Sequence, residues 1–268
     1  MTDQDSSSKK EAAPIVPAST VLLLRDGAEG LEVFMVVRHH QIDFASGALV
    51  FPGGKADPQD FDAELRELAD NGHDDDKLFA AQVSALRETF EECGILLARD
   101  LDTDKTIDGV TLASLQRYRQ PIVDHEMTFA QLLRDKGLRL QCGELGHFAH
   151  WITPDMMPKR FDTHFYATAA PEDHLALHDG HESVDSVWIK PSTALAEAEA
   201  GTRTIIFPTL RNIEKLAKFD SVSAALNACR AETPVPVTPW VEKRGDDRYL
   251  CIPPDAGYDV NEELMPAR

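Results

Sequence analysis

The sequence lacks the features that mark several large protein classes. Its four cysteines are widely separated and form no Cys-x-x-Cys pair, which argues against a zinc ribbon and a disulfide framework and suggests a reducing compartment. No apolar run approaches the length of a transmembrane helix. Positive charge is scarce, because 27 Lys and Arg stand against 46 Asp and Glu, for a net charge of −19. A general nucleic-acid binder needs a basic face, so we expect neither a nucleic-acid nor a membrane partner.

Neither end of the given sequence resembles a targeting signal. Residues 1–17 are polar and mixed in charge, unlike a signal peptide, and they have little to bury, so we expect a disordered tail there. The final Pro266-Ala267-Arg268 does not resemble a peroxisomal signal. We therefore expect a cytoplasmic protein.

What the sequence does contain is an acidic stretch that runs from Arg87 to Ile95. Glu88, Glu91 and Glu92 stand at i, i+3 and i+4, so a helix places them on one face. Crowded carboxylates repel one another unless a cation lies among them. A hard cation such as Mg²⁺ prefers carboxylate oxygens and shares its remaining positions with substrate phosphates. The alternative is an ordinary acidic surface on an acidic protein.

A tight glycine turn lies upstream, in Phe51-Pro52-Gly53-Gly54-Lys55, directly after an apolar run. Two glycines let the backbone approach a ligand closely and expose its carbonyl and amide groups. A glycine turn followed by an acidic helix favours a site for metal and phosphate over a plain acidic surface.

Gly54 and the stretch from Arg87 to Ile95 together resemble the signature box of the Nudix hydrolases, which cleave nucleoside diphosphates linked to another group. The spacing departs from the usual box, because Asp60 stands where a glutamate is usual and Arg87 comes about nineteen residues late. The excess, near residues 57–77, looks like an inserted acidic helix and loop. A box interrupted at this point resembles the coenzyme A diphosphatases of the peroxisomal type and their bacterial relatives.

A second segment bears on the substrate. Nudix enzymes that cleave coenzyme A often carry an arginine and a glycine ahead of the box, and Arg38 and Gly47 fall at matching spacing. The interior departs from that motif, because His39 replaces a small residue and Asp43 replaces a second arginine. The resemblance implies a small-molecule nucleotide substrate, with coenzyme A or acyl-coenzyme A leading, cleaved to 4′-phosphopantetheine species and adenosine 3′,5′-bisphosphate. Arg38 could also be an ordinary solvated strand end.

Other functions stay open at this point. Nucleotide sugars and dinucleotides are alternative substrates for the same chemistry. A Nudix-like module that senses a nucleotide without cleaving it is an alternative of another class, although three crowded carboxylates weigh against it.

The chemistry of a diphosphate bond indicates the roles of the residues. Hydrolysis needs an activated water and charge relief on the phosphoryl oxygens, and a bound divalent metal supplies both. We expect the three glutamates to ligate Mg²⁺ or Mn²⁺, with the Gly53 carbonyl as a further ligand and Arg87 orienting the carboxylates. The general base is a box glutamate or Glu182, which precedes an expected strand and could equally be merely solvated.

An anionic substrate must reach an anionic protein, so we expect a local basic rim. Arg38, Lys55, Lys159 and Arg160 are its candidates, and Gly54 completes the substrate-binding set. For Lys159 a solvated strand end is as plausible as a functional role.

A histidine-rich segment offers a competing site. A helix could align His174, His178 and His181, which would suit a transition metal. The intervening Asp179-Gly180 breaks helices and favours a flexible acidic loop instead.

The periodicity of the chain predicts alternating strands and helices. Strands are expected at residues 18–24, 32–38, 48–51, 148–153, 161–169 and 184–189, and helices at 78–93, 111–134 with a break at Pro121, 192–200, 209–218 and 221–231. Gly94 is placed to end the first helix in the left-handed cap position. Mixed strands with helices on both sides predict an α/β/α sandwich with a mixed β-sheet, which the Nudix resemblance also implies.

The length of the chain favours one α/β domain with insertions. We expect the Nudix domain to span residues 18–232, with helical insertions near 57–77 and 100–146. Residues 233–268 would form a C-terminal extension in which 249–252 could add a strand. The insertions could close over the ligand or form a homodimer surface.

Overall fold

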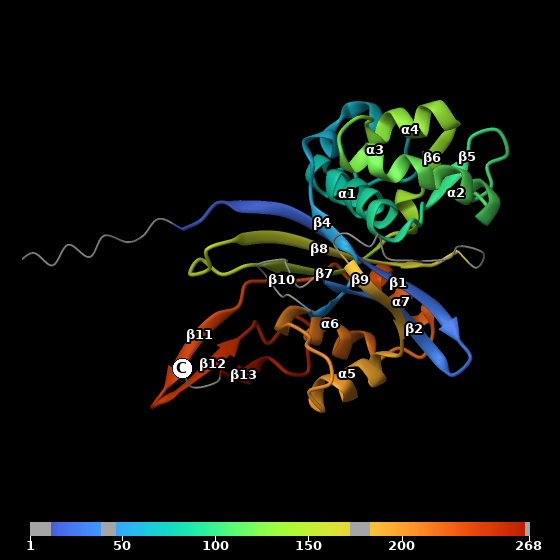
Figure 1. The fold of residues 1–268 in the computed structure, drawn as a ribbon. Coiled ribbons are helices and arrows are strands. Elements are labelled where there is room, and N and C mark those ends of the chain that lie inside the picture. The colour runs from blue at the N-terminus through green and yellow to red at the C-terminus, as the bar shows by residue number, and fades with distance from the viewer. Residues whose placement is uncertain (1–11, 39–46, 172–182, 266–268) are drawn as a thin grey trace, which may run out of the picture.

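A mixed β-sheet forms the centre of the protein, as the computed structural model shows for residues 12–38, 47–171 and 183–265 (Figure 1). Within these ranges the sheet contains β1 (Ile15–Gly27), β2 (Gly30–Arg38), β3 (Leu49–Val50), β4 (Gly53–Lys55), β7 (Gly146–Ile152), β8 (Arg160–Ala169), β9 (Ser183–Ile189) and β10 (Pro236–Val237). The main path runs β10-β7-β8-β1-β2-β3, while β4 pairs with β1 and β9 pairs with β2. Strand β1 is parallel to β8 and antiparallel to β2, so the sheet is mixed, as predicted.

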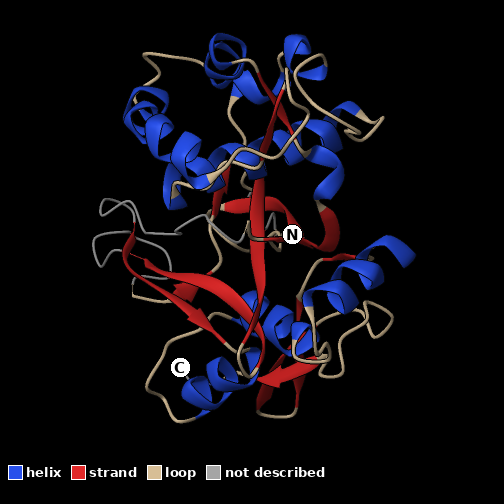
Figure 2. Cartoon of the chain, turned by 90° about the vertical axis from the view of Figure 1, so that its right-hand side faces the viewer, coloured by secondary structure: helices blue, strands red, loops and turns tan. Residues whose placement is uncertain are grey.

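Helices cover both faces of this sheet (Figures 1 and 2). One face carries α1 (Asp76–Cys93), α2 (Gly109–Leu115), α3 (Arg119–Val123) and α4 (Phe129–Lys136), and the other carries α5 (Pro191–Glu199), α6 (Phe207–Leu216) and α7 (Val222–Ala231). Alternate residues of β1 point to opposite faces of the sheet. Val21 and Leu23 pack in the core with α1. Leu22 and Leu24 pack in the core with α6 and α7. The predicted α/β/α sandwich is confirmed.

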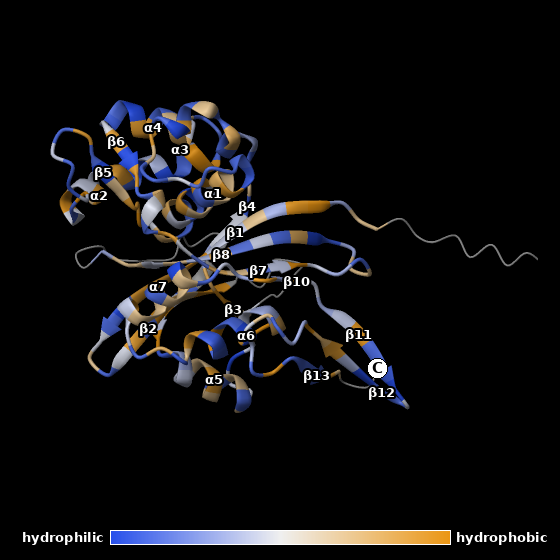
Figure 3. Cartoon of the chain, turned by 180° about the vertical axis from the view of Figure 1, so that it is seen from behind, coloured by the Kyte–Doolittle hydropathy of each residue, from blue (hydrophilic) through white to orange (hydrophobic). Residues whose placement is uncertain are grey.

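The helices on the α1 side show both apolar and hydrophilic residues in the view from behind (Figure 3), as one-sided burial requires. Helix α1 begins at Asp76 and is capped by Asp75, whose side chain accepts hydrogen bonds from the N–H groups of Lys77 and Leu78. It ends at Cys93 and is capped by Gly94, which takes a φ of 69° and donates its N–H to the Phe90 carbonyl. The prediction of this helix and of its glycine cap is confirmed.

The insertion at residues 57–77 is built differently from the expected acidic helix. Two 3₁₀ helices, η1 (Pro58–Phe61) and η2 (Ala63–Arg66), occupy its first half. Asp57 and Asp62 each cap one of them by accepting an N–H from the residue two places ahead. Because such local side-chain bonds compete with a continuous helix, the chain restarts after a single turn, and the prediction of one helix here is wrong.

The second insertion contains short elements as well as the expected helices. Strands β5 (Ala98–Asp100) and β6 (Leu138–Leu140) pair with each other, and a 3₁₀ turn, η3 (Gln116–Tyr118), separates α2 from α3. Pro121 lies inside α3 rather than at a break, because it stands in the first turn of that helix, where a missing N–H costs nothing.

The two ends of the described chain are more ordered than expected. Strand β1 already begins at Ile15, which pairs with Arg160 of β8, so the expected disorder up to residue 17 is wrong for residues 15–17. At the other end, β11 (Trp240–Arg244), β12 (Asp247–Cys251) and β13 (Glu262–Leu264) form a separate antiparallel sheet. The strand expected near residues 249–252 is confirmed as β12, and it has two partners.

Candidate active site

The glycine turn and the acidic face of α1 meet in space. The Gly53 N–H donates to Glu92 Oε2 at 2.9 Å. A Cβ atom on Gly54 would lie 2.4 to 2.6 Å from the carboxylate atoms of Glu88, which is closer than real contacts allow. Glycine is therefore needed at position 54 because any side chain there would occupy the space of the Glu88 carboxylate. The requirement comes from this close approach and not from the backbone angles of Gly54. The two segments that the sequence singled out form one site.

Arg87 holds this site together from the buried side. Its Nε lies 2.8 Å from Asp60 Oδ1, and its Nη1 lies 3.0 Å from Glu88 Oε1 and 3.1 Å from Glu91 Oε1. A further hydrogen bond runs from Arg87 Nη2 to the Lys55 carbonyl at 3.0 Å. The side chain of Arg87 is 4% exposed and that of Asp60 is fully buried, so each charge depends on the other. The orienting contacts expected of Arg87 are present.

Burial governs the protonation of the acidic face. It raises the pKa of Glu88 to about 7, against the opposing charge of Arg87 and with the support of the Glu91 carboxylate. Burial also raises the pKa of Glu91. For Arg87 burial alone would lower the pKa, but the hydrogen bonds and charge of Asp60, together with Glu88 and Glu91, outweigh it and raise that pKa. The face therefore holds more negative charge than Arg87 can balance, and a hard divalent cation fits this set of oxygen donors.

A cavity of about 500 Å³ opens beside this face. Gly53, Gly54, Lys55 and Glu92 are among the residues that line it, and most of the wall is apolar. The apolar lining comes from separate strands, loops and helix ends, and includes Phe51, Trp151, Met156, Phe161, Phe165, Phe207, Val241 and Leu250. A large, mostly apolar cavity with a small number of polar groups in its wall is typical of a small-molecule site.

A family model described as the NUDT19 Nudix domain matches residues 69–216, which is more than half of the chain. The chain belongs to the Nudix family. Nudix hydrolases generally use divalent metal ions, which agrees with the oxygen-rich face of α1 in this Nudix hydrolase.

Relatives along most of the chain support this assignment. The acyl-coenzyme A diphosphatase NUDT19 of Xenopus laevis is 23% identical over 281 residues, which cover 87% of this chain and 73% of the relative. The human protein of the same name is 25% identical, covering 89% and 76%, and the putative nudix hydrolase 7 of Caenorhabditis elegans is 25% identical, covering 88% and 73%. The crystal structure of a NUDIX hydrolase from Alicyclobacillus acidocaldarius superposes with a TM-score of 0.65 at 28% identity, covering 80% of this chain and 96% of that one.

The cationic residues expected around the Nudix site lie in different surroundings. Lys55 and Lys159 both line the cavity. Arg160 does not: its guanidinium is buried, its Nε donates to the Thr153 carbonyl at 3.1 Å, and its Nη2 pairs with Asp155 at 2.6 Å. The structure thus uses Arg160 to fix the turn between β7 and β8, and the substrate contact expected of it is not among the cavity contacts.

Several other expected residues fall at or beyond the limits of the described chain. Arg38 ends β2, and its backbone pairs with Ser183 of β9. Glu182 lies outside the described residues, as do the segment with His39 and Asp43 and the segment with the histidines at positions 174, 178 and 181.

Sequence reasoning missed two kinds of residue at this Nudix site. Arg119 of α3 donates from Nε and Nη2 to the Glu91 carbonyl at 3.1 and 2.8 Å, so it holds the last turn of α1. The apolar cavity wall was also missed. Neither has a local signal in the sequence, because each arises from contacts between segments far apart in the chain.

None of the helices in the described ranges combines the length and apolar character needed to cross a bilayer.

Proposed function

We propose that this Nudix hydrolase cleaves the diphosphate bond of coenzyme A or acyl-coenzyme A, releasing 4′-phosphopantetheine or its acyl derivative and adenosine 3′,5′-bisphosphate. The observation that carries the proposal is the apolar cavity of about 500 Å³ that opens at the glycine turn and Glu92. A diphosphate at the glutamates would leave the long arm of coenzyme A to extend into this cavity, whereas a nucleotide sugar has no apolar arm to fill it. The names of the frog and human relatives support the same substrate class.

The oxygen donors of α1 are proposed to hold Mg²⁺ or Mn²⁺. Glu88, Glu91 and Glu92 would be the ligands, with the Gly53 carbonyl as a further one. When bound, such an ion supplies charge relief on the phosphoryl oxygens and lowers the pKa of a bound water. The protein's own contribution is geometry: Arg87 holds two of the carboxylates, and the Gly53 N–H holds the third at 2.9 Å. A box glutamate or Glu182 would accept the proton of the attacking water.

Basic residues at the cavity are proposed to bind the phosphates. Lys55 and Lys159 line the cavity, and Lys55 follows the glycine turn directly. Arg38 at the end of β2 is the third candidate. In a protein of net charge −19, these cations and the metal would offset the repulsion of an anionic substrate.

A turnover screen tests the proposal. The protein is incubated with coenzyme A, an acyl-coenzyme A, a nucleotide sugar and a dinucleotide, each with Mg²⁺, with Mn²⁺ and with chelator, and the products are identified by mass spectrometry. We expect metal-dependent release of adenosine 3′,5′-bisphosphate from the coenzyme A species. Glu91→Gln should lose at least about a hundredfold in kcat, since it removes a metal ligand. The matched control, Glu126→Gln, makes the same chemical change at an exposed position and should leave kcat unchanged.

Each contrary result has a definite meaning. If the protein cleaves sugar nucleotides or dinucleotides but no coenzyme A species, the substrate assignment is wrong and the chemistry stands. If the protein cleaves nothing in the panel and still binds a nucleotide, it is a nucleotide-sensing module and not an enzyme.

A further inference from the structure

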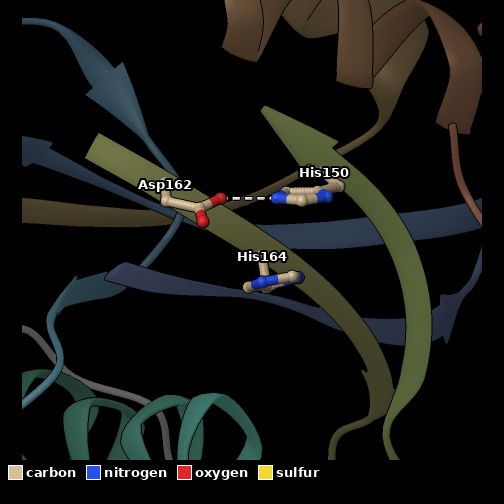
Figure 4. Close-up of side chains that lie close together, drawn as sticks. All are labelled: His150, Asp162 and His164. Atoms are coloured by element: carbon tan, nitrogen blue, oxygen red, sulfur yellow. Dashed lines mark hydrogen bonds and ion pairs between the residues drawn. The ribbon is translucent and has the colours of Figure 1, made fainter. Parts of the chain in front are cut away.

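Two histidines and an aspartate face one another on β7 and β8 (Figure 4). His150 of β7 and His164 of β8 are direct partners across the two antiparallel strands. Asp162 lies two residues before His164, so it points to the same side of the sheet. The neighbours of the two histidines point the other way: Trp151 follows His150, Thr163 and Phe165 flank His164, and all three line the cavity. The cluster therefore lies on the opposite face of the sheet from the cavity.

The spacing of the donor atoms suits a metal ion. One atom from each of the three side chains lies within 4.8 Å of the others. His150 Nε2 lies 2.5 Å from Asp162 Oδ1, and the rings of His150 and His164 stack with centroids 4.1 Å apart. Bonds of about 2.1 Å from a tetrahedral ion place its ligands roughly 3.4 Å apart, so modest side-chain adjustment is enough. Two imidazoles and one carboxylate are a donor set that Zn²⁺ and similar ions prefer.

A β-bulge adds a third imidazole to the same face. The register of β7 against β8 shifts between His147 and Ala149, so β7 has one extra residue there. Without this bulge His147 and His150, three residues apart, would point to opposite faces. With it, His147 Nε2 lies 3.1 Å from His164 Nδ1.

Two imidazoles on this face, those of His147 and His164, have lone pairs available for a metal ion. Burial lowers the pKa of His147 to about 3 and that of His164 to about 4, and the neighbouring imidazoles add to both shifts. Both rings are therefore neutral near pH 7, which is the form that binds metal. The side chains also remain reachable from solvent, because His150 is 15% exposed and Asp162 is 38% exposed.

We propose that His150, Asp162 and His164 form a second metal site, for a divalent transition metal of the Zn²⁺ class. It differs from the glutamate site in its chemistry, since that site offers carboxylate oxygens and suits Mg²⁺ or Mn²⁺. It also lies across the sheet from the cavity, and it depends on neither the substrate nor the proposed reaction. An ion there would tie β7 to β8 by their side chains in addition to their backbone hydrogen bonds.

Metal titration of the full chain tests this site. Metal-free protein is first given excess Mg²⁺ to fill oxygen-only sites, and Zn²⁺ is then added in a calorimeter, with Co²⁺ in a parallel optical titration. We expect one Zn²⁺ per chain, visible d–d absorption from Co²⁺, and a melting temperature that rises with Zn²⁺. His150→Gln with His164→Gln should weaken binding at least a hundredfold.

Two control variants separate this cluster from other histidines. His125→Gln removes an exposed imidazole elsewhere, and its Zn²⁺ binding should equal that of the wild type. His174→Gln, His178→Gln and His181→Gln together remove the competing histidine segment and should leave the binding unchanged. If the loss of Zn²⁺ follows this triple variant, or if the wild type binds no Zn²⁺, the proposed site is wrong.

A further variant and a direct measurement protect the test from a folding defect. Asp162→Asn keeps the size of the side chain and should weaken Zn²⁺ binding at least tenfold, with an unchanged circular dichroism spectrum. X-ray absorption of the Zn²⁺-loaded wild type should show two imidazole ligands. A zinc shell without imidazole would overturn the proposal without the use of any variant.

Discussion

Glu88 is closely confined by its surroundings on the acidic face. It packs where a Cβ of Gly54 would be, its Oε1 lies 3.0 Å from Arg87, and burial raises its pKa to about 7. Three independent features of the surroundings thus act on one side chain. Its position and its charge can be tested separately.

Replacing Gly54 tests the position of Glu88. The methyl group of Gly54→Ala would lie within 2.6 Å of the Glu88 carboxylate, so that carboxylate must move out of the acidic face. We expect kcat to fall by about a hundredfold or more while the circular dichroism spectrum stays the same, because a displacement of about 1 Å is enough to cause such a loss.

The chain offers a matched control for this change. The Cβ of Gly27→Ala would also come too close to a carboxylate, at 2.6 to 2.9 Å from that of Glu32, in a hairpin far along the sequence from α1. This variant should retain its turnover. Equal kcat in both alanine variants would show that the position of Glu88 does not matter for the reaction.

The pH dependence of stability tests the charge of Glu88. A carboxyl group whose pKa is raised in the folded state, here from 4.5 to about 7, stabilises the fold below pH 4.5, and this contribution is lost as the pH rises through about 7. In chelator, the free energy of unfolding of the wild type, relative to Glu88→Gln, should fall by at most about 3 kcal/mol across that window. Urea titrations at several pH values measure the difference.

Added metal provides the control for the pH experiment. Mg²⁺ stabilises the ionised carboxylates, so it should reduce the fall between the same two pH values. A wild-type difference that is flat in chelator would mean that Glu88 is already ionised in the folded protein.

At the scale of elements, a buried ion pair joins the first insertion to α1. Asp60 of η1 receives two hydrogen bonds from Arg87 of α1, at 2.8 and 3.0 Å. The neighbouring Gln59 side chain accepts the N–H of Phe129 at the start of α4. The insertion therefore links α1 to the helices that cover it, and its removal would leave the Arg87 charge without its main partner.

Replacing Asp60 tests this link. Asp60→Asn leaves a buried guanidinium without its closest counter-charge, so the free energy of unfolding should fall by on the order of 3 kcal/mol. Glu64→Gln is the matched control, since Glu64 of the neighbouring η2 pairs with Arg134 of α4, whose side chain is 52% exposed. Its effect should stay below about 1 kcal/mol. Similar losses in the two variants, measured by urea denaturation, would show that burial of the Asp60 pair adds nothing.

At this scale, secondary-structure elements with a long periodic pattern were predicted correctly, and several short elements were not. The helix at residues 78–93 was predicted because Val83, Leu86 and Phe90 repeat with the helical period and Gly94 follows as a cap. Strands β5 and β6 span three residues each, which is too short for any period to emerge. The turns of the first insertion depend on capping by Asp57 and Asp62, and an acidic composition alone does not distinguish caps from a helical face.

At the scale of the whole molecule, the carboxylate face was predictable and the cavity was not. The glutamates and the glycine turn lie within two short segments, so their spacing could be read directly from the sequence. The residues that line the cavity come from along the chain, from Ala18 in β1 to Met265 after β13. The volume of the cavity depends on how β8, α6 and the sheet of β11 to β13 pack together. The spacing of residues along the sequence does not indicate how far apart these elements lie in the fold.

The cavity wall has a consequence for the order of synthesis. Val241 and Leu250, from β11 and β12, line the same cavity as residues of β1 and β8, which are synthesised earlier. Until translation reaches these two strands, the apolar side chains of Phe161 and Phe165 lack one of their covering walls. The nascent chain thus carries an incomplete apolar groove beside an already synthesised acidic helix, and the pocket is completed only after β11 and β12 are made.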